Sequence, residues 1–220
     1  MDGRSATILG ATGLVGGHLL ELLLEDPRWT SVTTLGRRPL GRRHDKLQDV
    51  VVDFEALDDH AARFAADDVL CCLGTTMKQV GSKEAFRAVD ERYPLTAARL
   101  ARDQGAGGFL LVSAVDANPH SLFFYNRVKG EVEARLREHG PDRVHVVRPS
   151  LLLGQRGQPR PMERFAERLF NGLGFVLVGP LSKYRPVHGR TVARALVTLA
   201  AEGEAGFHTW EPDDLRRLGA

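Results

Sequence analysis

The sequence predicts an α/β protein of the Rossmann type, a doubly wound parallel sheet with a small C-terminal extension on the substrate side. Strand and helix patterns alternate through the first 150 residues, which is typical of a parallel sheet covered by helices. A glycine-rich turn joins the first strand to the first helix. The runs at 69–73 and 109–112 are continuously apolar, as in strands that helices cover on both faces.

Composition restricts the class of protein. A chain of 220 residues predicts one domain over 1–220, with about 154–220 forming the substrate-side portion. The 43% hydrophobic and 26% charged residues are typical of a globular chain and exclude a disordered one. The net charge of +2 comes from interspersed charges without a basic stripe, so we expect no nucleic-acid partner. No signal-peptide pattern or membrane-length apolar run is visible, which predicts a cytoplasmic protein without a membrane partner.

The expected elements follow from local patterns. In the first helix, leucines recur at helical spacing from Leu14 to Leu24, and Pro27 stops it. Short apolar and β-branched runs, several of them closed by glycine, predict strands at 5–10, 31–36, 47–54, 67–76, 107–114 and 143–154, the last running into a loop. Amphipathic patterns predict further helices at 54–64, 82–105, 121–140, near 162–171 and near 189–202.

Three details refine this assignment. Ser82 is the expected N-cap of the helix at 82–105, and Pro94 is expected to kink that helix. Gly140 is expected to end the helix at 121–140. The stretch 172–188 is irregular, and a short tail is expected after the helix near 189–202.

The glycine turn is the first functional signal. Gly10, Gly13 and Gly16 follow the first strand and open the first helix, which is the context of a dinucleotide-binding turn. The first glycine permits the tight turn, the second lets the backbone approach a pyrophosphate, and the third allows close helix–strand packing. Amide groups at the helix N-terminus would then hold the phosphates. The alternative is a turn with a purely structural role.

The end of the second predicted strand indicates which nucleotide is preferred. Proteins that prefer NAD carry an acidic residue about 20 positions beyond the glycines, where it binds the ribose 2′-hydroxyl. This chain has Arg37 and Arg38 there instead, and guanidinium groups suit a 2′-phosphate. The sequence therefore predicts NADP(H) in preference to NAD(H), unless the two arginines are merely solvated loop charges.

A tyrosine–lysine pair predicts carbonyl chemistry. Tyr125 and Lys129 are four residues apart on a predicted helix and so share one face. Ser113 lies at the end of a predicted strand, at the same carboxyl edge of the sheet as the glycine turn. Tyr125 would give a proton to a carbonyl oxygen, Lys129 would lower its pKa, and Ser113 would hold the substrate oxygen. The pattern Y-x-x-x-K also arises by chance, so the prediction depends on all three features together.

Other polar residues have weaker interpretations. His188 could face the substrate, although an N-terminal structural role in the following helix is favoured. Four C-terminal cations could bind an acidic group of the substrate, although solvated loop charges are commoner: Arg156, Arg160, Lys183 and Arg185. Cys71 and Cys72 would face opposite sides of a strand and suit buried thiols in a reducing compartment. No clustered His/Cys spacing is present, so no metal site is expected.

These motifs together resemble a known family. "GATGLVG" at 10–16, the strand-end Ser113 and "YNRVK" at 125–129 are similar to the short-chain dehydrogenase/reductases. "LGRRP", "CCLGTTMKQVGSKEAFRAVD", "FLLVSAVDANPHSLFFYNRVKGEVE" and "RPSLLLGQR" resemble the atypical branch of Tat-interacting-protein-like oxidoreductases, over about residues 6–200. Members of that branch often carry a second serine and a lysine after the position of Ser113, where this chain has "AVDA".

The resemblance implies a Rossmann fold that binds NADP(H), with Ser113, Tyr125 and Lys129 in the catalytic positions. It also implies the remaining cofactor contacts. The phosphate turn would comprise Gly10, Thr12, Gly13, Leu14 and Val15, Arg37 and Arg38 would meet the 2′-phosphate, and the further contacts would be Asp53, Phe54, Leu73, Gly74, Thr75, Thr76, Arg148, Pro149 and Ser150.

Three functions follow as hypotheses, in order of preference. The first is an NADP(H)-dependent oxidoreductase that reduces a small carbonyl compound, acting as a monomer or homodimer. The second is a non-catalytic regulatory protein that senses NADPH, since the same branch includes redox-sensing regulators. The third is a nucleotide-sugar epimerase or isomerase, which would need a larger C-terminal portion than the roughly 60 residues left here.

Overall fold

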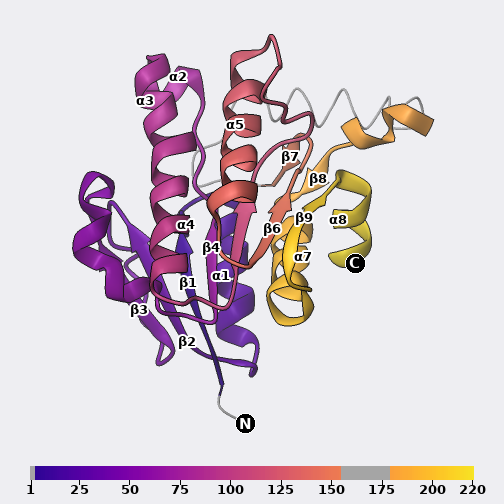
Figure 1. Cartoon of the computed structure of the whole chain (residues 1–220). Coiled ribbons are helices and arrows are strands. Elements are labelled where there is room, and N and C mark those ends of the chain that lie inside the picture. The colour runs from indigo at the N-terminus through magenta and orange to yellow at the C-terminus, as the bar shows by residue number, and fades with distance from the viewer. Residues whose placement is uncertain (1–2, 155–178) are drawn as a thin grey trace.

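A seven-stranded parallel sheet forms the centre of the molecule. The computed structural model describes residues 3–154 and 179–220. Across the sheet the strands lie in the order β3 (Leu47–Val51), β2 (Trp29–Gly36), β1 (Arg4–Leu9), β4 (Asp68–Cys71), β5 (Phe109–Val112), β6 (Arg143–Val147) and β9 (Gly206–Trp210) (Figure 1). The strand order reverses between β1 and β4, and ligands bind at the carboxyl edge beside such a point. The predicted doubly wound fold is confirmed.

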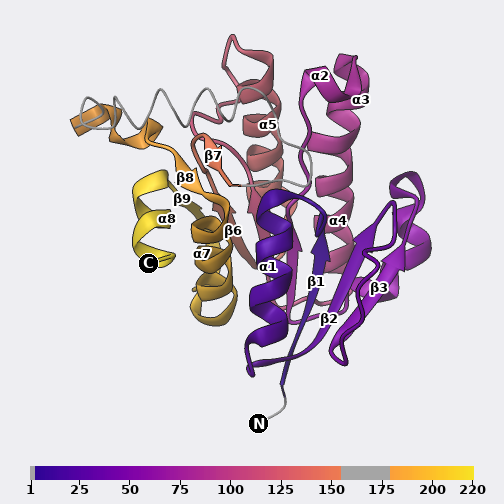
Figure 2. The same ribbon diagram turned by 180° about the vertical axis from the view of Figure 1, so that it is seen from behind.

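Helices cover both faces of this sheet (Figures 1 and 2). On one face α1 (Leu14–Glu25) packs beside α7 (Gly189–Glu202), and their apolar side chains share one core with β1. On the other face a 3-10 helix, η1 (Phe54–Phe64), lies with α4 (Tyr93–Asp103) and α5 (Phe124–His139) over a second core. Every residue of β4 is buried between the two layers, which explains why the residues that follow Asp68 in this strand are all apolar.

The two cysteines lie as the alternation of a strand requires. Cys71 is fully buried in the core under α4 and α5. Cys72 is half-buried and packs toward the opposite core, under α1. Burial raises the pKa of the Cys71 thiol to about 11, so this residue stays protonated at neutral pH and behaves as an apolar side chain.

The helix expected at 82–105 is interrupted. It consists of α3 (Lys83–Arg87), a π-helical turn η2 (Ala88–Arg92) and α4. Ser82 is the N-cap, as predicted, and its Oγ accepts the N–H of Ala85 at 3.1 Å. Pro94 has no N–H to give, and the N–H of Tyr93 just before it reaches back to the carbonyl of Ala88 in a widened turn. The kink expected at Pro94 therefore takes the form of a π turn.

Two other segments differ from the expected regular helices. At 54–64 the structure has 3-10 helix with non-helical dihedral angles at Ala56 and His60, while Phe54, Leu57 and Phe64 still face the core. A short helix, α2 (Met77–Val80), follows β4 in a stretch that the sequence patterns had left without a helix. The helix at 121–140 is confirmed as α5, and Gly140 follows its last residue.

The prediction of a short tail after residue 202 is wrong. The chain continues into β9, which pairs in parallel with β6, and into α8 (Pro212–Leu218), which begins with a capping box of Glu211 and Asp214. β9 is an edge strand with no fully buried residue, so its sequence lacks the continuous apolar run that identifies the central strands. The two-stranded pair β7 (Leu152–Leu153) and β8 (Val187–His188) and the 3-10 helix η3 (Gly179–Tyr184) precede α7. The helix expected near 162–171 lies outside the described residues.

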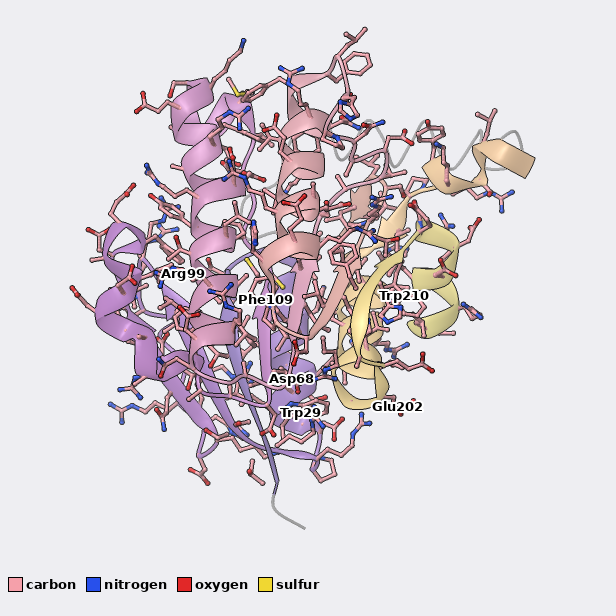
Figure 3. The ribbon with its side chains drawn as sticks, in the orientation of Figure 1. Trp29, Asp68, Arg99, Phe109, Glu202 and Trp210 are labelled. Atoms are coloured by element: carbon pink, nitrogen blue, oxygen red, sulfur yellow. The ribbon has the colours of Figure 1, made fainter. Side chains whose placement is uncertain are left out.

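A buried charge cluster ties the strands together at the end opposite their carboxyl edge. Asp68, at the start of β4, is fully buried and accepts hydrogen bonds from Arg4 at 2.7 Å and from Arg143 at 2.6 Å. Figure 3 shows Asp68 and Trp29 at this same amino-terminal end. In the described part of the chain, no helix has the length and apolar character needed to cross a bilayer.

Candidate active site

The glycine turn has the geometry that close approach of a ligand requires. Gly10 has a φ of 86°, and the N–H of Gly13 bonds to its carbonyl at 2.9 Å. A Cβ on Gly10 would lie 2.7 Å from the carbonyl oxygen of Cys72, and one on Gly16 would lie 2.2 Å from that of Gly10. Gly13 is the N-cap of α1 and supplies no side-chain cap, so the first amide groups of the helix remain available for an anion.

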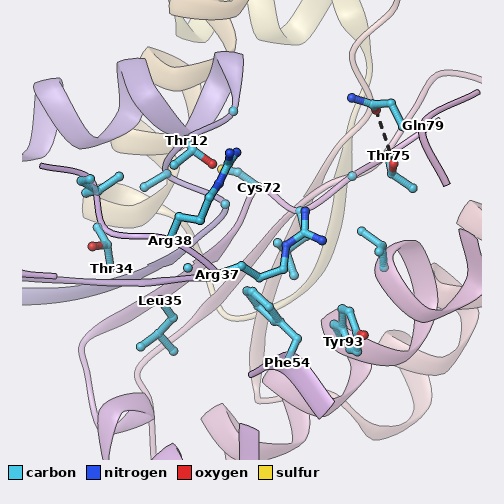
Figure 4. Close-up of a pocket in the computed structure, with 18 of the residues that line it drawn as sticks. Thr12, Thr34, Leu35, Arg37, Arg38, Phe54, Cys72, Thr75, Gln79 and Tyr93 are labelled. Carbon is cyan, nitrogen blue, oxygen red and sulfur yellow. Dashed lines mark hydrogen bonds between the residues drawn. The ribbon is translucent and has the colours of Figure 1, made fainter. Parts of the chain in front are cut away.

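A pocket of about 410 Å³ opens beside this turn (Figure 4). It brings together the ends of β1, β2 and β4 with the start of α1, which is where the sequence predicted the cofactor. The predicted residues that line it are Gly10, Thr12, Gly13, Arg37, Arg38, Phe54, Leu73, Gly74 and Thr75. Sequence reasoning missed four further polar lining residues: Thr34, Asp49, Gln79 and Tyr93.

Five predicted cofactor residues lie near this pocket without lining it. Leu14, Val15 and Gly16 form the buried first turn of α1. Asp53 caps η1, where its Oδ1 accepts the N–H of Glu55 at 3.0 Å. Thr76 is the N-cap of α2. These residues shape the segments around the pocket, and their contact with a cofactor stays a prediction.

Two arginines enter the pocket from the end of β2. Figure 4 shows Arg38 on the side of Thr12 and Arg37 on the side of Phe54. Among the described residues, no ion pair joins either guanidinium group to a carboxylate. The pair can therefore bind an external anion without first breaking an internal ion pair.

The one carboxylate in the described lining is already engaged. Asp49 accepts the Thr34 hydroxyl at 2.9 Å and the backbone N–H of Leu40 at 2.7 Å. It thereby ties β3 to the loop that carries Arg37 and Arg38. A lone aspartate in a short strand has no sequence signal that distinguishes it from a solvated residue, which is why it was missed.

The expected catalytic pair lies on α5. Tyr125 is 40% exposed near the start of the helix, whereas Lys129, one turn later, is 3% exposed. The Lys129 ammonium is 2.9 Å from Asp90 Oδ1, on η2. Asp90 also accepts the N–H of Thr75, a lining residue, at 2.9 Å, and so connects the pair to the cofactor pocket. Neither Tyr125 nor Lys129 lines the pocket itself.

The predicted lowering of the tyrosine pKa is not what the structure shows. The partial burial of Tyr125 raises the pKa of its hydroxyl, Lys129 lowers it and Asp90 raises it again, so that the pKa lies above its ordinary value. The sequence pattern places Lys129 near Tyr125 but gives no sign of its partner Asp90. Because burial, and to a smaller extent Asp90, oppose the effect of Lys129, the lysine does not bring the pKa of Tyr125 down toward neutral pH.

Ser113 belongs to a buried network. Its Oγ donates to Glu133 Oε1 at 2.5 Å, and the serine is 4% exposed. Arg148 forms an ion pair with the same glutamate and a second one, at 2.9 Å, with Glu211. The structure thus joins two predicted site residues, Ser113 and Arg148, through a glutamate that the sequence patterns did not single out. The catalytic role of Ser113 stays a prediction.

The remaining predicted residues lie at the carboxyl end of β6 and beyond it. Pro149 is buried, and Ser150 Oγ donates to the carbonyl of Arg185 at 2.5 Å. Lys183 is paired with Asp116 at 2.5 Å and is therefore not a freely solvated charge. His188 is the N-cap of α7, the favoured structural role. Arg156 and Arg160 lie outside the described residues, and within the described ranges no group of acidic, His or Cys side chains could hold a metal ion.

The fold and site define a dinucleotide-binding protein of the Rossmann class, and comparison with known proteins identifies its family. The model of the NAD dependent epimerase/dehydratase family matches residues 6–211, so the chain belongs to that family. Protein HTATIP2 of Rattus norvegicus is 42% identical over 177 residues, which cover 79% of this chain and 73% of the relative. The mitochondrial protein FMP52 of Debaryomyces hansenii is 34% identical over 203 residues, covering 90% and 88%. The resemblance to Tat-interacting-protein-like oxidoreductases is confirmed.

A solved structure shares the fold. The Bordetella bronchiseptica enzyme WbmH, determined in complex with NAD⁺, superposes with a TM-score of 0.71 at 19% identity, covering 94% of this chain and 75% of that one.

The comparisons also overturn one expectation. Several FMP52 relatives are named mitochondrial, so the inference of a cytoplasmic location from the sequence is wrong.

Proposed function

We propose that the chain is an NADPH-dependent oxidoreductase that reduces the carbonyl group of a small molecule. The observation that carries the cofactor choice is the placement of Arg37 and Arg38 on the pocket, without a carboxylate partner among the described residues. The glycine turn supports a dinucleotide, because side chains at Gly10 and Gly16 would collide with backbone atoms and the bare backbone leaves room for phosphates.

The choice between the two nucleotides depends on the 2′-phosphate. A charged hydrogen bond contributes about 1.5–3 kcal/mol, which is roughly tenfold to a hundredfold in affinity. Arg37 and Arg38 would supply such bonds to NADPH, while NADH offers only a ribose hydroxyl at the same place. Among the described lining residues Asp49 is the one carboxylate that could favour NADH, but its two oxygens already accept hydrogen bonds from the Thr34 hydroxyl and the Leu40 N–H.

Calorimetric titration tests this proposal. NADPH and NADH are titrated into the native chain and into Arg37→Ala and Arg38→Ala, with Arg42→Ala as the matched control on an exposed arginine outside the pocket lining. We expect each of the first two changes to weaken NADPH about tenfold or more while NADH binding barely changes. Unchanged NADPH affinity in both pocket variants would refute the 2′-phosphate assignment.

Tyr125 is the proposed proton donor. Bound NADPH would supply a hydride to the carbonyl carbon. The Tyr125 hydroxyl gives its proton to the carbonyl oxygen, which completes the alcohol, and the phenolate regains a proton from water. Lys129 lies one turn below it on the same face of α5 and is held by Asp90. Ser113 would orient the carbonyl only if its hydroxyl exchanges Glu133 for the substrate.

Two substitutions test the chemistry. Tyr125→Phe should abolish NADPH consumption across a panel of aldehydes, ketones and quinones while leaving NADPH affinity intact, because the ring stays and only the hydroxyl is lost. Ser113→Ala separates two roles for the serine: loss of turnover would support contact with the substrate, and retained turnover would leave it a partner of Glu133 alone. Full activity in Tyr125→Phe would remove the proton-donor role.

A second candidate is a regulatory protein that binds NADPH without turnover. The observation that favours it is the commitment of the Ser113 hydroxyl to Glu133, which leaves the predicted substrate contact occupied. Tight NADPH binding together with no consumption over the same carbonyl panel would favour this candidate. Turnover of any one compound that is lost in Tyr125→Phe would favour the reductase.

A further inference from the structure

Asp90 occupies an unusual position for a carboxylate. It lies in the π-helical turn η2 and is 1% exposed. One of its oxygens accepts the N–H of Thr75, and the other lies 2.9 Å from the ammonium of Lys129, itself 3% exposed. The residue thus joins the pocket loop after β4, the widened turn before α4, and the proposed catalytic helix α5.

Stability alone does not account for this pair. Removing two charges from water is unfavourable, and well-packed apolar residues of similar volume often serve as well or better in the same place. Oxygen Oδ1 of Asp90 has no hydrogen bond in the described structure apart from its ion pair with Lys129. A π turn frequently marks a functional site. These features point to a role in the chemistry of α5.

The surroundings of Lys129 show what that role is. Among the described residues, three titratable groups act on its ammonium: Asp90 from η2, Tyr125 from α5 and Cys71 from β4. Cys71 is uncharged at neutral pH, because burial raises its pKa to about 11. Burial is the largest influence and opposes the charged form of Lys129, but Asp90, with smaller contributions from Tyr125 and Cys71, raises the pKa of the ammonium above its ordinary value. Lys129 is therefore positively charged, and the negative charge of Asp90 lies in direct contact with it.

We propose that Asp90 is a positioning residue that cancels the charge of Lys129 and fixes its ammonium beneath Tyr125, so that Tyr125 keeps its proton and acts as the acid of carbonyl reduction. This inference rests on the proposed function. An unopposed lysine would favour the phenolate, which is the base that alcohol oxidation needs. The Asp90–Lys129 ion pair instead keeps Tyr125 in its protonated form, which can donate a proton to the substrate. Burial is the main cause of the raised pKa of Tyr125, and Asp90 acts in the same direction, against Lys129.

The direct test is an NMR titration of the protein without nucleotide. Tyrosine labelled with ¹³C at Cζ gives three signals, from Tyr93, Tyr125 and Tyr184, and the spectrum of Tyr125→Phe assigns the one of interest. In Asp90→Asn the Asn oxygen can still accept the N–H of Thr75, but the negative charge is gone. We expect the Tyr125–Lys129 pair to lose its first proton at lower pH, by on the order of one pH unit, which is the size of effect that nearby charges produce.

A matched control separates this effect from a general change in charge. Asp103→Asn makes the same substitution on α4, where the carboxylate pairs with Arg99 and Arg102 in contact with solvent. It should leave the Tyr125 titration unchanged. A native-like titration in a folded Asp90→Asn protein would overturn the proposal, as would an equal shift in the control.

A second variant covers the case in which an unpaired Lys129 prevents folding. The double change Asp90→Asn with Lys129→Met leaves no charge in the buried site, a replacement that structures often tolerate. If Asp90 cancels Lys129, the Tyr125 midpoint should stay near its native value. A clear rise would mean that Lys129 acts as an unopposed cation, and would overturn the proposal.

The two levels of inference fail separately. The NMR titration needs neither cofactor nor turnover, so its outcome judges Asp90 alone. Absence of NADPH binding in the calorimetric experiment would refute the proposed function without altering the measured coupling between Asp90, Lys129 and Tyr125.

Discussion

Mild acid should destabilise the folded chain through His145, in the middle of β6. This histidine is fully buried, and its Nδ1 accepts the indole N–H of Trp210 at 3.1 Å. His208 stacks against it with ring centroids 5.2 Å apart. Burial, His208 and Arg143 lower the pKa of His145 to about 4 from its ordinary 6.5. Protonation would place a charge in the core and remove the acceptor that Trp210 uses.

The magnitude follows from that difference in pKa. Between the two values the unfolded chain binds a proton at this histidine and the folded chain does not, so the free energy of unfolding falls as the pH drops through 6.5 and stops falling near 4. Each pH unit within that window is worth about 1.36 kcal/mol, so the loss from His145 between about pH 7.5 and about pH 5 is about 2 kcal/mol.

Urea unfolding of the native chain and of His145→Asn at these two pH values measures the contribution. Asparagine keeps an oxygen near the position of Nδ1 but does not titrate in this range. The variant is expected to be less stable at neutral pH, because its smaller side chain leaves a cavity, yet its loss on acidification should be about 2 kcal/mol smaller than that of the native chain. His120→Asn, on an exposed loop, should behave as the native chain does. Parallel pH dependence in the native chain and His145→Asn would refute the reasoning.

Two further changes separate backbone and charge contributions at the site. Gly16→Ala places a Cβ 2.2 Å from the carbonyl oxygen of Gly10, so it should lower the free energy of unfolding by about 1–3 kcal/mol and abolish nucleotide binding. Gly17→Ala is the control: the nearest atom to its Cβ lies at an ordinary 3.5 Å, and the change should stabilise α1 by about 0.5–1 kcal/mol. Glu133→Gln removes the buried charge that pairs with Arg148 and should lower the free energy of unfolding by about 1–3 kcal/mol, whereas Glu138→Gln, exposed on the same helix, should have little effect. Urea unfolding and NADPH titration measure both pairs.

The predicted site residues whose placement the structure matches are those set by local geometry, and their roles stay predictions. The glycine turn can be predicted because the backbone a few residues away leaves no room for a side chain, as the close contacts of a Cβ at Gly10 and Gly16 show. Arg37 and Arg38 are readable because they follow directly from the end of a recognisable strand. Tyr125 and Lys129 are readable because a helix fixes residues four apart on one face.

The parts that the sequence did not predict are partnerships between distant segments. The sequence predicts catalytic roles for Ser113 and Lys129, but in the structure Ser113 donates a hydrogen bond to Glu133 and Lys129 forms an ion pair with Asp90. Nothing in the pattern around Asp90 distinguishes it from a solvated helical carboxylate. Only the π turn and the packing of η2 on α5 bring it against the lysine. The seventh strand was missed for a related reason, since β9 depends on an existing edge of the sheet for its hydrogen bonds.

These partnerships make α5 an unusual helix. Its buried face carries Lys129 and Glu133, four positions apart, where an ordinary packed helix would place apolar residues. Each charge is matched from another element, Lys129 by Asp90 on η2 and Glu133 by Arg148 after β6. Burying two ion pairs on one helix is unfavourable unless their geometry is good, and apolar replacements would stabilise the fold at least as well. Lys129 is connected to the pocket through Asp90 and Thr75, and Glu133 is bonded to Ser113 at the end of β5, which together support a chemical role for this face of α5.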